Sequence, residues 1–147
     1  MEENYNVRQI ALEDYPTIDK WHEQYGEKKP KSSLLPLGGL GGFIIEKNQK
    51  PIAAIYLYVT NSSMGYFDFL ISDPNYREKD RFEIIMKLFQ YVTKVAIDLG
   101  CECVFVTTAV PGVMEKMKEL GVREELEYDD ERRVIIYTYE KKNKVFS

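Results

Sequence analysis

The chain has 147 residues and a mass of 17.2 kDa, which matches one ordinary domain with a core of its own. Hydrophobic residues make up 44% and charged residues 30% of the chain, a composition that excludes intrinsic disorder. The net charge is 20 − 24 = −4, which argues against sequence-independent nucleic-acid binding as its main work, because such binding needs many cations to neutralise phosphates. We expect a single globular domain over residues 1–147.

The amino-terminal segment does not read as a targeting signal. Residues 1–4 (MEEN) are acidic where a signal peptide is basic, and no apolar stretch follows. No apolar run approaches the roughly 20 residues of a membrane span. These features predict a cytoplasmic protein with no membrane partner. Nucleic acid is not an expected partner, although a local basic patch remains open.

The first elements are a strand and a helix. Residues 6–10 predict a short strand. Asp14 is a good N-cap, Pro16 follows just inside the helix, and Gly26 marks its end. The apolar face of this helix carries Ile18, Trp21 and Tyr25.

Residues 26–41 predict one long loop. It begins with the basic run Lys28-Lys29-Pro30-Lys31, which we interpret as solvated, and ends in the glycine cluster GGLGG. The glycine cluster precedes a strand and not a helix, so it fails the context of a dinucleotide-binding fingerprint. Loops of this length in a compact domain are typically functional or partly disordered.

Three strands follow, over residues 43–46, 51–59 and 64–71. Polar turns at residues 48–50 and 60–63 separate them. The middle strand, PIAAIYLYV, is almost continuously apolar and is therefore expected at the centre of the sheet. Together the three strands predict an antiparallel meander.

A long amphipathic helix is predicted over residues 80–99. Asp80 can cap its start, and Gly100 ends it. The apolar positions recur with helical spacing, at Phe82, Ile85, Leu88, Phe89, Val92, Val95, Ala96 and Leu99.

The carboxyl-terminal part predicts a buried strand centred on residues 104–106, a second helix from Pro111 to Leu120, and strands at 122–128 and 133–139. The order is β-α-β-β-β-α-β-α-β-β. It predicts an α+β (mixed α/β) fold with a central, mostly antiparallel sheet, one β-α-β crossover and helices on both faces.

This order resembles the GNAT superfamily of acetyl-CoA-dependent N-acetyltransferases. The most specific stretch starts at Leu70–Arg77, where a strand ends in an apolar-x-Pro segment before the long helix. It continues with Ala96–Gly100, then the strand at 104–106, and ends at Lys118–Val122. The resemblance covers residues 6–139 and implies the GNAT fold.

The resemblance also implies acetyl-CoA as the cofactor and a place where it binds. In the family, two strands separate and admit the pantetheine arm, which here implies a slot at Ser72 and Thr107. The arm would bond the backbone of Leu70–Ser72 by strand addition. The implied cofactor-binding residues are Leu70, Ile71, Ser72, Arg77, Lys79, Asp80, Arg81 and Thr107.

The chain departs from the family in the loop before the long helix. Family glycines there let backbone N–H groups approach the pyrophosphate, whereas this chain has Glu78, Asp80 and Phe82. A carboxylate about 5 Å from a phosphate costs roughly 3 kcal/mol at a dielectric constant near 20. Three cations in the same loop could offset this repulsion, bind the phosphates, or pair with the acids: Arg77, Lys79 and Arg81.

The candidate catalytic residues are Asp68 and Tyr66. By strand alternation Tyr66, Asp68 and Leu70 share one face, and Asp68 lies between two phenylalanines. The family often uses an acidic residue on this strand as the general base for the ammonium nucleophile. The alternative interpretation is a solvent-facing or salt-bridged aspartate. Met117 matches the position of the family's general-acid tyrosine and cannot donate a proton.

Other chemically capable residues have simpler interpretations. His22, the only histidine, is expected to be a surface or packed helix residue. Cys101 and Cys103 are expected to be small buried hydrophobes, because no second pair of ligands accompanies them for a metal.

Two functions remain open. The first is an N-acetyltransferase that moves an acetyl group from acetyl-CoA to an amine of a small molecule, protein or nucleobase. The second is a GNAT-like interaction or regulatory module that has lost CoA binding. A looser likeness to phage-encoded members, which also lack the glycines, lies in Gly42–Glu46, Pro51–Ala54 and Asp68–Pro74. A monomer and a homodimer are both compatible with the sequence.

Overall fold

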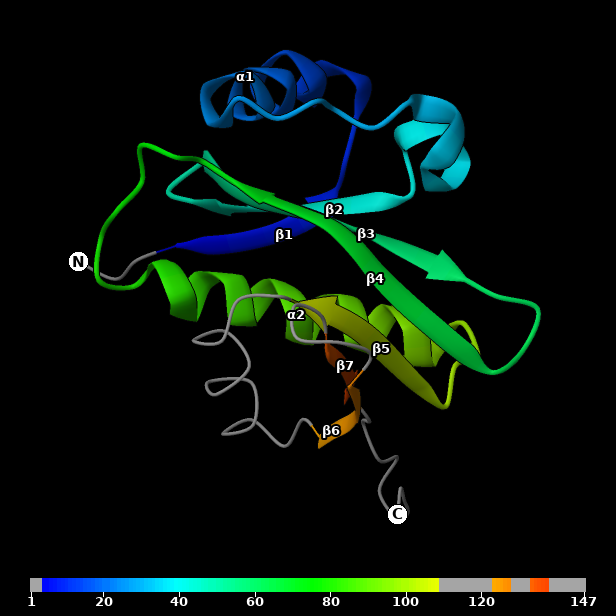
Figure 1. The fold of residues 1–147 in the computed structure, drawn as a ribbon. Helices are drawn as coiled ribbons and strands as arrows, with labels where there is room; N and C mark the ends of the chain where they lie inside the picture. The colour runs from blue at the N-terminus through cyan, green and yellow to red at the C-terminus, as the bar shows by residue number, and fades with distance from the viewer. Residues whose placement is uncertain (1–3, 109–122, 128–132, 138–147) are drawn as a thin grey trace. The chain divides into compact units, whose positions relative to one another are not determined.

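The computed structural model describes residues 4–108, 123–127 and 133–137. Its helices and strands follow the expected order along these residues (Figure 1). The predicted helix after Pro111, with Met117, lies outside the described residues. The elements are β1 (Tyr5–Gln9), α1 (Tyr15–Tyr25), β2 (Gly42–Lys47), β3 (Lys50–Val59), β4 (Met64–Ser72), α2 (Arg81–Asp98), β5 (Cys103–Thr108), β6 (Arg123–Glu127) and β7 (Arg133–Tyr137).

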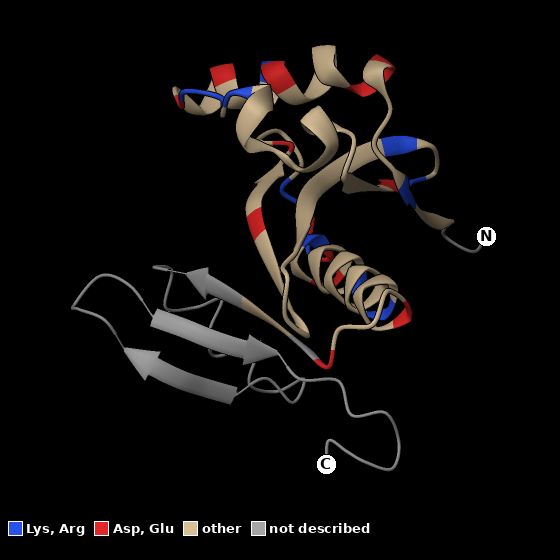
Figure 2. Ribbon diagram, turned by 90° about the vertical axis from the view of Figure 1, so that its right-hand side faces the viewer, with Lys and Arg blue, Asp and Glu red and all other residues tan. Residues whose placement is uncertain are grey.

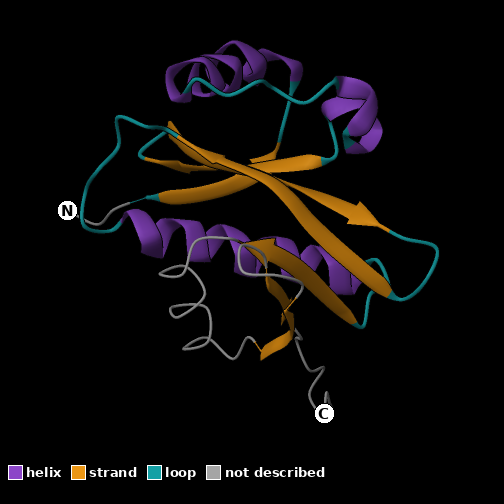
Figure 3. Ribbon diagram, viewed as in Figure 1, coloured by secondary structure: helices purple, strands orange, loops and turns teal. Residues whose placement is uncertain are grey.

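The strands form a mixed sheet that is hydrogen-bonded in the order β1-β2-β3-β4-β5-β7-β6. The pairs β1–β2, β2–β3, β5–β7 and β6–β7 are antiparallel, whereas β4 and β5 are parallel and connected through α2. This arrangement confirms the α+β, mostly antiparallel sheet with one β-α-β crossover (Figure 3).

The chain divides into two compact units. The first comprises Met1–Leu57 with Phe69–Val92, and the second comprises Tyr58–Asp68 with Thr93–Ser147. Strand β4 passes from the second unit into the first between Asp68 and Phe69. That the whole of residues 1–147 acts as one domain stays a prediction.

In the first unit, helices lie on both faces of the sheet. Figure 1 shows α1 on one side of β1–β3 and the first part of α2 on the other. The ends of α1 are those that the sequence predicts: Asp14 is the N-cap residue, Pro16 lies in the first turn, and Gly26 takes the left-handed conformation at φ 71°.

The core of the first unit is centred on β3. Every residue from Ile52 to Leu57 is buried, which confirms that the continuous apolar run is a central strand covered on both faces. Apolar side chains from β2 and from both helices complete it: Ile18, Trp21, Ile44, Ile45, Ile84, Leu88, Phe89 and Val92.

The predicted loop between α1 and β2 contains two short 3-10 helices, at Ser32–Leu34 and Pro36–Gly39. The Tyr15 hydroxyl donates to the Gly39 carbonyl and lies 2.9 Å from the Tyr56 hydroxyl. A Cβ on Gly39 would lie 2.7 Å from the Tyr15 oxygen, and φ there is 105°. Glycine is therefore required where the loop meets α1.

Within the described ranges, no helix is both long and apolar enough to cross a membrane. Helix α2 instead carries charges of both signs on its exposed side, among them Glu83 and Lys87 (Figure 2). This is the amphipathic pattern of a helix with one buried face.

Candidate functional site

The loop between β4 and α2 is anchored to the sheet at its start. The Asp73 N–H donates to the Ile52 carbonyl at 2.8 Å, which ties the loop to β3. The Asp73 side chain and carbonyl then accept the N–H groups of Asn75 (2.8 Å) and Tyr76 (3.2 Å). This Asp-Pro-Asn turn reverses the chain without any glycine.

The backbone before α2 presents a row of hydrogen-bond donors. Within the described part of the chain, no partner is found for the N–H groups of residues 77–80, whereas the Arg81 N–H donates to the Glu78 carbonyl at 3.1 Å. The N–H of Asp80 adjoins the helix start, where unpaired donors are ordinary and carry the partial positive charge of the helix, whereas those of residues 77–79 belong to the loop. Such a row suits an anion.

The Asp80 carboxylate is held by three side chains. Lys47 Nζ donates to Oδ2 at 2.7 Å, the Tyr5 hydroxyl donates to Oδ2 at 3.0 Å, and the Tyr76 hydroxyl donates to Oδ1 at 2.6 Å. These bonds, that from Lys47 foremost, lower the pKa of Asp80 to about 2. Burial and the bond to Asp80 raise the pKa of Tyr76. Asp80 is thus a charged centre joining β1, β2 and the loop.

Arg81, the first residue of α2, turns toward the end of β4. Its Nη2 donates to Ser72 Oγ at 2.7 Å, and the Tyr25 hydroxyl lies 3.4 Å from the same oxygen. Its Nε–H is buried and has no acceptor among the described residues. No carboxylate within that part of the chain pairs with this guanidinium, so its charge is uncompensated locally.

The other two predicted phosphate-binding cations lie at the surface. Arg77 and Lys79 are exposed, and Arg77 Nε donates to the Pro74 carbonyl at 3.0 Å. Arg77 and Lys79 thus lie in the loop that contains the row of backbone donors, and Arg81 lies directly after it as the first residue of α2.

The predicted pantetheine-binding segment is the end of β4. Ile71 and Ser72 are buried, whereas Leu70 is 40% exposed. Phe69, directly before them, has φ 58°, a left-handed conformation that costs a non-glycine residue on the order of 1–2 kcal/mol. The extended backbone is interrupted at this point, directly after the candidate base.

Asp68 and Tyr66 are brought together on one face of β4. The Tyr66 hydroxyl donates to Asp68 Oδ2 at 3.0 Å. The Tyr66 ring also lies beside Tyr58 of β3 and Phe105 of β5, with centroid distances of 5.8 and 4.7 Å. Burial, and after it the charge of Asp68, raises the pKa of Tyr58. Asp68 thus borders an aromatic cluster.

Thr107 lies on β5 opposite Val134 of β7. The parallel register of β4 with β5 joins Met64–Phe67 to Cys103–Val106, while β4 itself runs on to Ser72. The implied slot at Ser72 and Thr107 stays a prediction.

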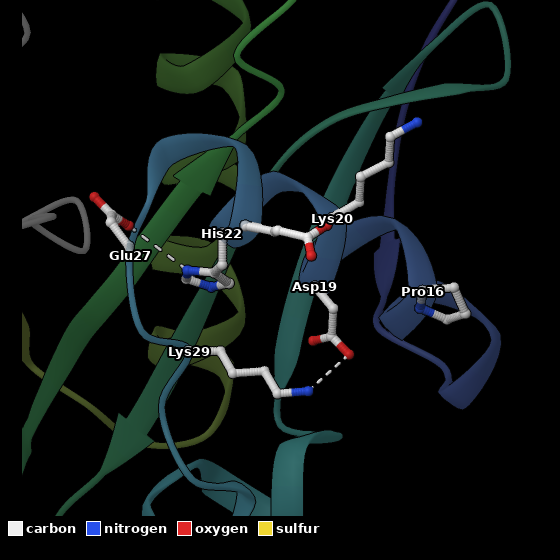
Figure 4. A pocket seen from close by; sticks show the side chains of 7 residues that line it. Pro16, Asp19, Lys20, His22, Glu27 and Lys29 are labelled. Atoms are coloured by element: carbon white, nitrogen blue, oxygen red, sulfur yellow. Dashed lines mark hydrogen bonds and ion pairs between the residues drawn. The ribbon is translucent and has the colours of Figure 1, made fainter.

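Residues around His22 form a separate, shallow pocket of about 550 Å³ on α1 (Figure 4). His22 is buried, and its Nδ1 lies 3.6 Å from Glu27 Oε1; Lys29 pairs with Asp19 at 3.0 Å. Among the described residues, no group of three or more His, Cys, Asp or Glu is placed to hold a metal ion. The pocket contains none of the predicted site residues.

The sequence analysis missed the residues that support the site. Tyr76 is four positions before Asp80, a spacing that could have suggested their contact. Lys47 and Tyr5 carry no such signal, because they are distant in sequence and meet Asp80 only through the pairing of β1 with β2 (Tyr5 opposite Lys47). Tyr25, which reaches Ser72, was interpreted only as part of a packed helix face.

Comparison with known proteins identifies the fold. No protein-family model matches the chain, and no curated protein does. Solved structures do match. N-acetylglutamate synthase from Neisseria gonorrhoeae, complexed with coenzyme A and N-acetyl-glutamate, has a TM-score of 0.71 at 16% identity, over 94% of this chain and 36% of that one. This chain therefore spans about a third of the length of the synthase.

Two shorter proteins match over almost their entire length. The ribosomal-protein-S18-alanine N-acetyltransferase from Escherichia coli has a TM-score of 0.71 at 11% identity, over 97% of this chain and 100% of that one. PaiA N-acetyltransferase from Thermoplasma acidophilum, in complex with coenzyme A, has a TM-score of 0.68 at 14% identity, over 92% of this chain and 99% of that one. At these identities the likeness defines the fold: the chain has the GNAT fold.

Proposed function

We propose that the chain is an N-acetyltransferase that transfers the acetyl group of acetyl-CoA to an amine. The observation that carries the proposal is the start of α2, where the unpaired N–H groups of residues 77–80 lie among three cations. In the GNAT fold this is the loop between the fourth strand and the long helix, to which the family resemblance assigns the pyrophosphate.

The residues present suit acetyl-CoA. A diphosphate needs backbone donors and positive charge, and residues 77–80 supply the first while Arg77, Lys79 and Arg81 supply the second. The Nε–H of Arg81 supports the same conclusion: it has no acceptor, and the guanidinium has no carboxylate partner, among the residues that the structure describes, and such a half-buried guanidinium favours an anion nearby. The backbone of Leu70–Ser72 would hold the pantetheine arm, with Thr107 as a further contact.

Asp68 is the proposed general base. Acetyl-CoA supplies the acetyl group as a thioester; the acceptor, an ammonium ion at neutral pH, must lose a proton before its nitrogen can attack. Asp68 would accept that proton, and Tyr66 would orient the carboxylate through its 3.0 Å hydrogen bond. As the nitrogen bonds to the acetyl carbon, the C–S bond of the thioester would break, and coenzyme A would leave as a thiol that carries the second proton lost by the nitrogen. The chemistry of the acceptor is open among small-molecule, protein and nucleobase amines.

Calorimetric titration with coenzyme A tests the proposal. We expect micromolar affinity for the wild type and a loss of at least tenfold in the Arg77→Ala/Lys79→Ala variant, because two phosphate-facing cations are removed. Lys28→Ala/Lys31→Ala is the matched control: it removes the same charge from two exposed lysines in the loop after α1 and should bind as the wild type does. No detectable heat at millimolar coenzyme A would contradict the proposal.

The second candidate, an interaction or regulatory module without CoA, is favoured by one feature: Glu78 and Asp80 stand where the family has glycines. The same titration separates the two, because the module predicts a folded protein with no affinity for coenzyme A.

A further inference from the structure

The Asp80 carboxylate lies directly before α2, where its negative charge would disfavour phosphate binding unless a cation compensates for it. Asp80 directly precedes the helix, and its own N–H is the last in the row of donors at residues 77–80. An uncompensated negative charge there would offset the partial positive charge of the helix N-terminus and repel a phosphate.

The negative charge of Asp80 is compensated by Lys47. Asp80 forms a compact group with Lys47, Tyr5 and Tyr76, here named the Asp80 cluster. The side chains of Lys47 and Asp80 are only 17% and 19% exposed, and their ion pair is 2.7 Å long. Lys47 Nζ also donates to the Tyr76 hydroxyl at 3.0 Å and lies 5.7 Å from the Tyr76 ring centroid. Water screens such a pair far less than an exposed one.

The Asp80 cluster also fixes the loop in space. Tyr5 belongs to β1 and Lys47 to β2, two paired strands, while Tyr76 belongs to the loop itself. The bonds to Asp80 thus attach the start of α2 to the sheet. The Asp80 carbonyl accepts the Ile84 N–H at 2.9 Å, so the same residue begins the helical hydrogen bonds.

We propose that Lys47 compensates, through its ion pair with Asp80, for the carboxylate that stands in place of the glycines of the family's loop: it cancels the charge that would repel an anion. In this proposal Lys47 and Asp80 make no contact with the phosphates, so that Asp80 is not one of the binding residues that the family resemblance implies, and the pair acts only through the local charge. The inference rests on the proposed function, since it assumes that coenzyme A binds at this loop.

Three variants separate charge compensation from mere structural support: Lys47→Met, Asp80→Asn, and the two combined. Coenzyme A affinity is measured by calorimetry at low and at high salt. We expect Lys47→Met to weaken binding at least tenfold at low salt, because the carboxylate is then uncompensated. The combined variant should return to within about threefold of wild type, and Asp80→Asn alone should bind as tightly as wild type or more tightly.

A purely structural role predicts a different pattern: every variant would lose affinity, and the combined variant would be no better than Lys47→Met. That result would overturn the inference, as would unchanged binding by Lys47→Met. Lys47→Arg keeps the charge and should bind as wild type does. Lys50→Met, which removes an exposed lysine opposite Lys47 in the β2–β3 register, is the matched control.

Two outcomes distinguish a failure of this inference from a failure of the proposed function. If the wild type does not bind coenzyme A, the proposed function fails and the inference fails with it. If the wild type binds and Asp80→Asn binds at least tenfold more weakly at low salt, only the inference fails. The Asp80→Asn comparison decides the matter even if Lys47→Met does not fold.

Discussion

At the residue scale, the environment of Asp68 on β4 includes Tyr66, two positions before it. The Asp68 carboxylate accepts a hydrogen bond from the Tyr66 hydroxyl, and the Tyr66 ring lies beside Tyr58 and Phe105. The hydrogen bond from the Tyr66 hydroxyl restricts the orientation of the Asp68 carboxylate. In the proposed mechanism the two residues act as one unit, in which Asp68 accepts the proton and Tyr66 fixes the orientation of the carboxylate.

For the substitution Asp68→Asn we expect kcat to fall by about 10²–10⁴-fold, because the amide cannot accept the ammonium proton. The affinity for coenzyme A should not change. The measurement is thiol release from acetyl-CoA with a panel of small amines, peptides and amino-nucleosides as acceptors. Tyr66→Phe, which keeps the carboxylate, should lose less; an unchanged kcat in Asp68→Asn would show that another group is the base.

At this scale the sequence predicted which residues are candidates but not what holds them. The strand alternation that pairs Tyr66 with Asp68 is local, so it could be inferred from spacing two apart. The contacts of Asp80 with Tyr5 and Lys47 bridge more than thirty residues, and no local pattern encodes them.

At the scale of elements, the turn between β2 and β3 contains two non-glycine residues with positive φ. Asn48 and Gln49 both have positive φ, 51° and 71°, and they lie between the paired residues Lys47 and Lys50. Two consecutive positive φ values are typical of a type I′ hairpin turn, in which Asn-Gly is the preferred dipeptide. The turn thus has the favoured first residue and an unfavoured second one.

Gln49→Gly should therefore stabilise the protein by about 1 kcal/mol, because glycine adopts positive φ without a steric cost. For a chain of this length, that is a rise in melting temperature of roughly 3 °C. Thermal unfolding followed by circular dichroism measures it. Lys50→Gly, at the first strand position, should lower the melting temperature; a fall for Gln49→Gly as well would contradict this assignment of the turn.

Element boundaries were predictable wherever a residue has a single strong backbone preference. Gly26 and Gly100 end α1 and α2 with φ of 71° and 105°, as their positions predict. The 3-10 helix at Pro36–Gly39 was not predictable from local sequence, because its last residue contacts Tyr15, a distant partner. The left-handed Phe69 was equally hidden within a regular strand pattern.

For the molecule as a whole, two carboxylates link stability to pH. Asp14 accepts hydrogen bonds from Arg8 at 2.8 Å, and this contact lowers its pKa. The pKa of Asp80 is about 2, against 3.8 for a free aspartate. Both groups bind protons less readily in the folded state. Their stabilising contribution is therefore present above pH 4 and is lost as the pH falls toward 2.

The prediction is a difference between wild type and Asp80→Asn that depends on pH. At pH 7 the variant should be less stable by up to about 2 kcal/mol, and the difference should shrink steadily below pH 4 toward pH 2, where about half of the wild-type carboxylate is protonated. Urea unfolding at pH 7, 4 and 2.5 measures it. A difference that stays constant over this range would mean that the ion pair with Lys47 contributes nothing to stability.

The burial of β3 on both faces affects how the protein behaves when it partly unfolds, because the strand is then exposed to other chains. The segment 51–59 has high β propensity, no charge and only one proline, at its first position. Such a segment is safe while helices cover it and prone to intermolecular stacking once they do not. Substitutions that detach α1 or α2 should therefore yield insoluble aggregates and not soluble unfolded chains, with β3 as the segment that seeds them.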